Sequence, residues 1–105
     1  LFVPNAFCPT HINNELNKFK PRATGLREYH IEIFDLYGNK LWESRDLENS
    51  EPKEAWDGTF NGVLLMQDVY VWKISALFKD DVVWDGIKYN DKNILKKTGT
   101  VTLIR

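Results

Sequence analysis

Few side chains in this chain of 105 residues could carry out acid–base or nucleophilic chemistry. The two histidines, His11 and His30, are the only groups that titrate near neutrality at their ordinary pKa. His30 lies on the polar side of an alternating stretch, which favours a solvent-exposed histidine. The single cysteine, Cys8, excludes an internal disulfide, and its simplest interpretation is a small buried residue. We find no nucleophile elbow, phosphate-binding loop or pair of zinc ligands.

The acidic residues that stand out are explained by turns. Asp80 and Asp81 follow a long apolar stretch, where aspartate commonly bonds to the turn backbone. Two Trp-Asp-Gly triplets, at residues 56–58 and 84–86, favour strand ends with an Asp-Gly turn and an inward-facing tryptophan. We therefore predict that the chain is not an enzyme, with no catalytic residue and no cofactor.

Composition excludes two further classes of function. Net charge is −1, from 14 basic and 15 acidic residues spread along the chain, whereas proteins that bind nucleic acids carry a basic face. The longest apolar run, residues 69–78, is interrupted by Lys73 and Ser75 and is too short to predict a membrane span. The chain opens without an export signal, so we expect a piece of a longer protein with a single domain over residues 1–105.

The hydrophobic pattern is that of β strands almost throughout. Residues 28–34 alternate, and a Gly-Asn pair at residues 38–39 predicts a hairpin to residues 41–43. Further strands are predicted over 69–78, from 82 to 84 and over 97–104, with loops at 45–54 and 85–94. The chain is thus predicted to be all-β, an immunoglobulin-like antiparallel β-sandwich of about seven strands.

Aromatic residues allow one binding function that differs from a purely structural role. Trp42, Trp84 and Tyr89 lie on predicted short strands or loop margins and could form a platform for sugars. The alternative function is therefore an adhesive or carbohydrate-binding β-sandwich module of a surface protein.

Five blocks of the sequence, in order along the chain, resemble the gliding-motility-associated C-terminal domain, the type B sorting domain of the Bacteroidetes type IX secretion system. The blocks are residues 3–9 (VPNAFCP), 29–39 (YHIEIFDLYGN), 56–62 (WDGTFNG), 67–73 (QDVYVWK) and 97–105 (KTGTVTLIR). Any one block would be weak, but the five occur in order and span the chain from residue 3 to residue 105.

The resemblance implies a sorting and surface-attachment signal at the end of a larger protein. Such a protein is exported through the periplasm and then held at the cell surface or secreted. The implied partners are an outer-membrane β-barrel of the PorP/SprF-like type, the type IX translocon and covalently linked upstream cargo domains. No catalysis is implied.

Two sets of residues follow from the blocks. The residues expected to preserve the fold are Pro4, Asn5, Phe7, Gly38, Trp56, Asp57, Gly58, Tyr70 and Trp72. The residues expected to bind the partner form the last predicted strand: Lys97, Thr98, Gly99, Thr100, Val101, Thr102, Leu103, Ile104 and Arg105. Our hypothesis is that this strand is an edge strand, whose unpaired backbone groups add to a sheet of the partner.

One stretch departs from the family pattern. Members often carry an acidic, glycine-rich turn after the opening block, which could hold a cation. Here residues 9–15 read PTHINNE, with Glu15 as the only full negative charge. Calcium prefers six to eight oxygen ligands that include several carboxylates. We therefore predict no metal.

Overall fold

The computed structural model describes residues 1–10, 17–84, 87–89 and 94–104. Within these ranges the chain forms β strands and no helix, so the all-β prediction is confirmed. The strands are β1 (Ala6–Phe7), β2 (Leu26–Phe34), β3 (Lys40–Ser44), β4 (Leu47–Glu48), β5 (Glu51–Pro52), β6 (Thr59–Phe60), β7 (Val63–Leu64), β8 (Asp68–Phe78), β9 (Ile87–Tyr89), β10 (Ile94–Lys96) and β11 (Thr98–Leu103).

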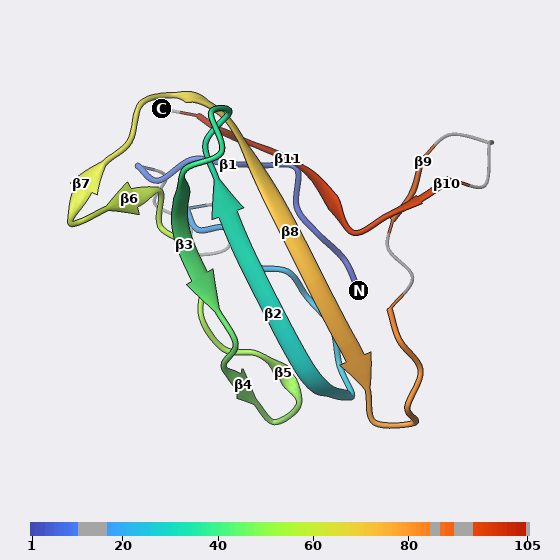
Figure 1. The fold of residues 1–105 in the computed structure, drawn as a ribbon. Helices are drawn as coiled ribbons and strands as arrows, with labels where there is room; N and C mark the ends of the chain where they lie inside the picture. Colours follow the sequence, from blue (N-terminus) through green and yellow to red (C-terminus); the bar gives the residue numbers. More distant parts are fainter. Residues whose placement is uncertain (11–16, 85–86, 90–93, 105) are drawn as a thin grey trace.

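A five-stranded sheet in the order β1-β11-β8-β2-β3 is the centre of the molecule (Figure 1). Its long antiparallel strands are β2 and β8, which pair from Leu26 opposite Phe78 to Phe34 opposite Val71. The sheet is mixed because β1 runs parallel to β11. Three small two-stranded units, β4–β5, β6–β7 and β9–β10, lie outside it.

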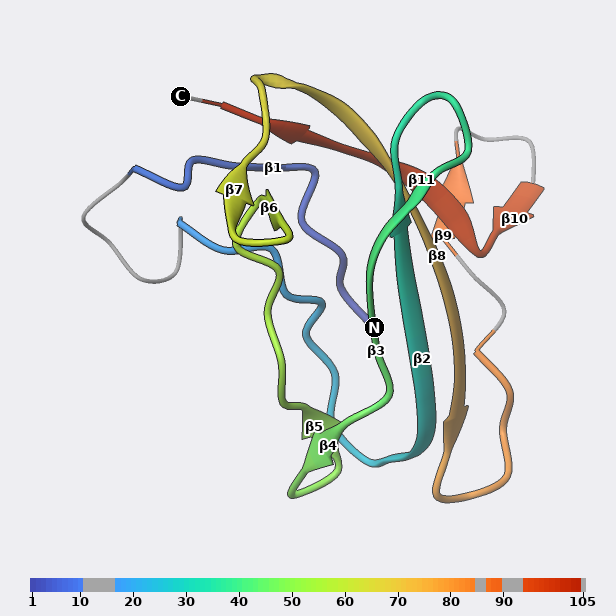
Figure 2. The ribbon, with the colours of Figure 1, turned by 60° about the vertical axis from the view of Figure 1, so that its left-hand side comes forward.

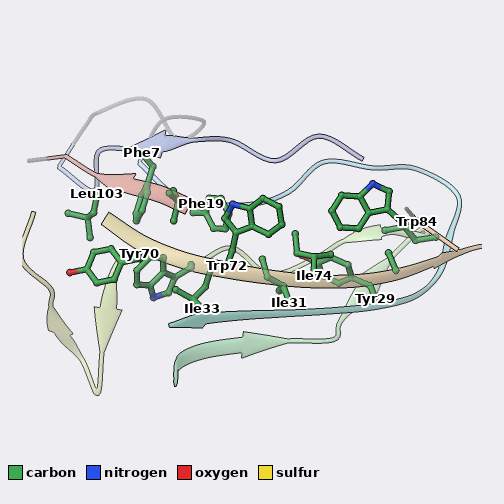
Figure 3. Close-up of a cluster of buried hydrophobic side chains, with 14 residues drawn as sticks. Phe7, Phe19, Tyr29, Ile31, Ile33, Tyr70, Trp72, Ile74, Trp84 and Leu103 are labelled. Carbon is green, nitrogen blue, oxygen red and sulfur yellow. The ribbon is translucent and has the colours of Figure 1, made fainter. Parts of the chain in front are cut away.

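Strict alternation explains why β2 and β8 form and which face they bury. Along β8, Tyr70, Trp72, Ile74 and Ala76 are buried, while the residues between them are partly or fully exposed. β2 buries Tyr29, Ile31 and Ile33 in the same way. A period of two places these side chains on one face of the sheet. Figure 3 shows the labelled side chains of β2 and β8 within the core.

Extended segments, rather than a second regular sheet, cover the buried face. Phe2 and Arg22 exchange two backbone hydrogen bonds of 2.7 and 2.8 Å, and Phe19 and Trp56 exchange two of 2.8 Å. Figure 2 shows the segments around these residues on one side of the sheet. They add Phe19, Pro21 and Trp56, all below 2% exposed, to the core. The described residues therefore show one open five-stranded sheet covered by a layer of extended chain, and they do not show a regular second sheet packed on the first.

Two of the predicted turns are present in the structure. The hairpin between β2 and β3 is confirmed: Gly38 has a φ of +87°, and the Asp35 carboxylate accepts backbone hydrogen bonds of 2.9 Å from Tyr37 and Asn39. These bonds lower the pKa of Asp35, with the Asn39 side-chain bond as the largest cause. The turn at residues 79–81 is also confirmed, with Asp81 at a φ of +66°.

Three segments differ from the prediction. Residues 45–54, expected as a loop, contain the short β4–β5 hairpin, whose turn residues Asn49 and Ser50 have positive φ. The return strand expected at 82–84 is reduced to one bridge between Leu77 and Val83. The loop expected over 85–94 contains β9 and the start of β10; residues 85, 86 and 90–93 lie outside the described residues. No helix in the described part of the chain is long and apolar enough to cross a membrane.

Candidate functional site

The last strand, expected to bind the partner, lies inside the sheet. β11 pairs with β8 along its whole length, from Thr98 opposite Lys73 to Leu103 opposite Asp68. Side chains of Val101 and Leu103 are fully buried. Lys97 and Ile104 flank the strand and are exposed, and Arg105 lies outside the described residues.

The hypothesis that this strand is a sheet edge is wrong for its C-terminal half. β1 pairs with it in parallel, Ala6 with Thr102 and Phe7 with Leu103. The Thr102 amide donates to Asn5 O (2.9 Å) and the Ile104 amide donates to Phe7 O (2.8 Å). The opening block of the sequence therefore closes the edge that the hypothesis left free, because it extends alongside the last strand.

Aromatic rings hold β1 in this position. Phe7 is 3% exposed, and its ring centroid lies 5.4 Å from that of Trp56 and 6.3 Å from that of Phe19. Trp56 in turn meets the Tyr70 ring edge to face at 5.3 Å. Such pairs contribute about 0.5–1.5 kcal/mol beyond the area they bury. Residues of three sequence blocks thus meet in the core, at the end where Figure 3 labels Phe7 and Tyr70.

Gly58 completes this contact on the side of the last strand. Its φ is +81°, and a Cβ at this position would lie 2.8 Å from Leu103 Cδ1 and 3.2 Å from Pro9 Cγ. Both the backbone conformation and the lack of space therefore require glycine. The Trp-Asp-Gly turn thus packs against the end of β11, and a role of this block in preserving the fold stays a prediction.

The side chains next to Gly58 shape the turn. Asp57 Oδ1 accepts hydrogen bonds from Thr59 N at 3.1 Å and Thr59 Oγ1 at 2.6 Å. Trp56 Nε1 donates to Thr59 O at 3.1 Å, so the buried indole has a partner. This is the inward tryptophan and turn-capping aspartate predicted for residues 56–58. The matching positions Asp85 and Gly86 lie outside the described residues.

The remaining motif residues do not all gather here. Pro4 is half-buried and Asn5 contributes its carbonyl to β11. Trp72 is 2% exposed and packs near Trp84, with ring centroids 6.4 Å apart. Gly38 lies in the turn between β2 and β3, with no atom within 4 Å of an added Cβ.

Trp84 does not contribute to the sugar platform predicted as an alternative. Trp84 is 7% exposed and belongs to the core, and Trp42 is half-buried against it. The Tyr89 side chain lies outside what the structure describes. A planar sugar surface that includes Trp84 is therefore contradicted by its burial.

A polar cluster on the outer face of the sheet was not foreseen. His30 Nε2 donates to Glu43 Oε2 at 2.9 Å, and His30 Nδ1 lies 3.9 Å from Glu32 Oε1. Lys40 Nζ lies 3.4 Å from Glu32 Oε2 and 3.4 Å from Glu43 Oε2. The His30 bond, followed by the Lys40 charge, holds the pKa of Glu43 below its usual value.

This cluster offers metal ligands as well as internal pairing. His30, Glu32 and Glu43 each have a ligand atom, all within 4.8 Å of one another. Lys40 competes for the same carboxylates, because its ammonium already lies between them. The alternation of β2 could have placed His30 and Glu32 on one face. That Glu43 of β3 joins them could be predicted only with knowledge of the register in which β2 pairs with β3.

Two reactive residues from the sequence remain. Cys8 is half-buried, rather than fully buried as expected, with Sγ 3.4 Å from Thr10 Oγ1. His11 lies outside the described residues. Comparison with protein-family models, with curated proteins and with solved structures finds no match.

Proposed function

We propose that the chain is a non-enzymatic sorting and surface-attachment domain of the type IX secretion kind. It would act at the end of a larger exported protein and be recognised by an outer-membrane barrel of the PorP/SprF-like type and by the translocon. The cargo would then be held at the cell surface or released.

One observation carries this proposal more than any other. The sequence blocks on which the resemblance rests converge in space: Phe7, Trp56 and Tyr70 form one aromatic contact, and Leu103 packs beside Gly58. Residues from four of the five blocks come together here, which supports reading the blocks as one fold pattern rather than as chance matches. The proposed function itself is inferred from the sequence resemblance.

We also propose that the fold is a reduced immunoglobulin-like sandwich. The layer opposite the sheet would correspond to the second sheet, shortened here to the bridges Phe2–Arg22 and Phe19–Trp56. The core between the layers, whose fully buried side chains include Trp56, Trp72 and Phe19, supports this interpretation.

The exposed threonines of the last strand are the part that we propose for recognition. Thr98 and Thr100 are exposed and Thr102 is half-buried on the outer face, so they are accessible in the folded domain. Deletion of residues 97–105 would not test this, because it removes a strand whose Val101 and Leu103 are core residues. A deletion variant that cannot fold and a folded one that is no longer recognised would both fail to be exported.

The function is tested by fusing residues 1–105 to the C-terminus of a fluorescent reporter that carries an export signal. The fusion is expressed in a host with type IX machinery, with and without its PorP/SprF-like barrel. We expect reporter at the surface or in the medium only when the barrel is present. A folded fusion that stays in the periplasm with the barrel present contradicts the proposal.

A matched control separates folding from sorting. In Leu103→Ala the recognised threonines are unchanged but the core has a cavity. Loss of export in this variant, together with a lower unfolding midpoint, would show that the folded domain, rather than a linear peptide, is read.

A further inference from the structure

The two halves of β11 have different neighbours on the side away from β8. Ile74 N donates to Lys97 O, so the backbone groups of odd-numbered residues point to β8. Thr102 N and Ile104 N donate to the β1 segment on the opposite side. Because successive residues of a strand point their backbone groups to alternate sides, those of Thr98 and Thr100 point away from β8.

No strand covers these groups in the described part of the chain. Pairing of β1 begins at Ala6, and the preceding chain turns away to pair Phe2 with Arg22. No backbone partner within the described residues reaches Thr98 or Thr100 on this side. The opening spans three residues, or about 10 Å of strand.

Side-chain burial marks the same opening. Gly99 shares the inner face with Val101 and Leu103, which are fully buried, yet Gly99 is partly exposed. It lies opposite Trp72 of β8. A neighbouring strand can place a bulky side chain over such a glycine and so cover the partly exposed inner face at Gly99.

The other edge of the sheet is poorly suited to docking. β3 carries Lys40 and Glu43, which are held in the polar cluster with His30. Its pairing with β2 shifts register between Ile33 and Phe34. Charges and irregular register are the features that blunt an edge against added strands. Thr98–Gly99–Thr100 has no charge, and its threonines favour strand pairing.

We propose that the outer edge of Thr98–Thr100 receives an extended strand of the outer-membrane barrel partner, with an apolar side chain over Gly99. This inference rests on the proposed function and specifies how the partner is recognised. Displacement of β1 is not needed. Unseating Phe7 would expose a core aromatic that is only 3% exposed in the folded domain.

The test removes the outward backbone donors without touching the core. Thr98→Pro and Thr100→Pro each delete one N–H that has no backbone partner among the described residues, and proline is tolerated where a strand N–H faces solvent. Thr98→Val and Thr100→Val are matched controls, because they change the same side chains and keep the N–H. Circular dichroism and thermal unfolding confirm that each variant is folded.

Binding is measured to the host's PorP/SprF-like barrel, purified in detergent, and export is scored with the same reporter fusion. Each proline variant is expected to bind about five- to tenfold more weakly, the loss of about one hydrogen bond, and to reduce export. The valine variants are expected to behave like the wild type. Hydrogen exchange of the Thr98 and Thr100 amides is expected to slow in the complex.

The outcomes separate the two proposals. A wild-type fusion that is not exported overturns the proposed function and this inference with it. A wild-type fusion that is exported, with folded proline variants that bind and export equally well, overturns only the inference. Sedimentation that shows a dimer of the isolated domain with protected Thr98 and Thr100 amides would assign the edge to a second copy, and also overturns it.

Discussion

The C-terminal half of β11 lies between β8 and β1, whereas its N-terminal half has β8 on one side only. In the C-terminal half Val101 and Leu103 are fully buried, and Leu103 packs so closely beside Gly58 that an added Cβ there would lie 2.8 Å from it. In the N-terminal half Thr98 and Thr100 present backbone groups and side chains to solvent. One strand can therefore combine a structural role and a recognition role, provided that they occupy different residues.

The largest expected difference between the two halves is in stability. Leu103→Ala is expected to lower the free energy of unfolding by about 2–5 kcal/mol, because it leaves a cavity at a fully buried site. Thr100→Val, on the exposed face, is expected to change it by less than about 0.5 kcal/mol. Urea unfolding followed by tryptophan fluorescence measures both. Equal effects of the two substitutions would remove the distinction between the halves.

Substitutions at two glycines of positive φ test the role of the Trp-Asp-Gly turn. Gly58→Ala and Gly38→Ala both place a Cβ on a residue of positive φ, at a cost of about 1–2 kcal/mol each. Only at Gly58 does the Cβ also meet Leu103, which adds about 1–3 kcal/mol. We expect Gly58→Ala to be the more destabilising variant in urea unfolding. Equal losses would mean that the contact with β11 has no energetic weight.

Two buried tyrosines at opposite ends of the core differ in the hydrogen bonding of their hydroxyl groups. Tyr70 donates its hydroxyl to Met66 O at 2.8 Å, whereas the buried Tyr29 hydroxyl has no partner among the described residues. Burial raises the Tyr29 pKa. Tyr70→Phe is expected to destabilise by about 1 kcal/mol and Tyr29→Phe to be neutral or stabilising by about 1 kcal/mol. Thermal unfolding of both variants decides this, and a destabilising Tyr29→Phe would reveal a partner for its hydroxyl.

The smallest effect concerns the charged edge at β3. Because the folded-state pKa of Glu43 is lowered, its interactions stabilise the fold above its ordinary pKa and are lost as the pH falls through the lowered value. His30→Ala removes the largest cause and is expected to raise the Glu43 pKa toward its ordinary value. An NMR titration of the Glu43 side-chain carboxyl follows this. An unchanged pKa would show that His30 and Glu43 are not paired in solution.

Local patterns predicted much of the fold. Alternation placed the buried side chains of β2 and β8 correctly, and the Gly-Asn pair located the β2–β3 hairpin. Both signals depend on neighbouring residues. Residues 45–54 were misjudged because polar residues and Pro52 favour a loop, while the short β4–β5 hairpin depends on the positive φ of Asn49 and Ser50.

Long-range pairing was beyond the sequence patterns. Nothing in residues 1–10 indicates that β1 runs parallel to β11, so the last strand was taken for an edge. The aromatic contact of Phe7 with Trp56 and the polar cluster of His30 with Glu43 likewise join segments whose spacing along the chain carries no signal. Such contacts depend on sheet order and register.

The division of β11 is tested most directly by amide hydrogen exchange of the free domain, followed by NMR. Thr102 and Ile104 amides, which donate to Asn5 and Phe7, are expected to exchange slowly, as are the odd-numbered amides that face β8. Thr98 and Thr100 amides are expected to exchange at least tenfold faster, about the effect of losing one hydrogen bond. Equal protection along the whole strand would contradict the open edge and, with it, the proposed place of recognition.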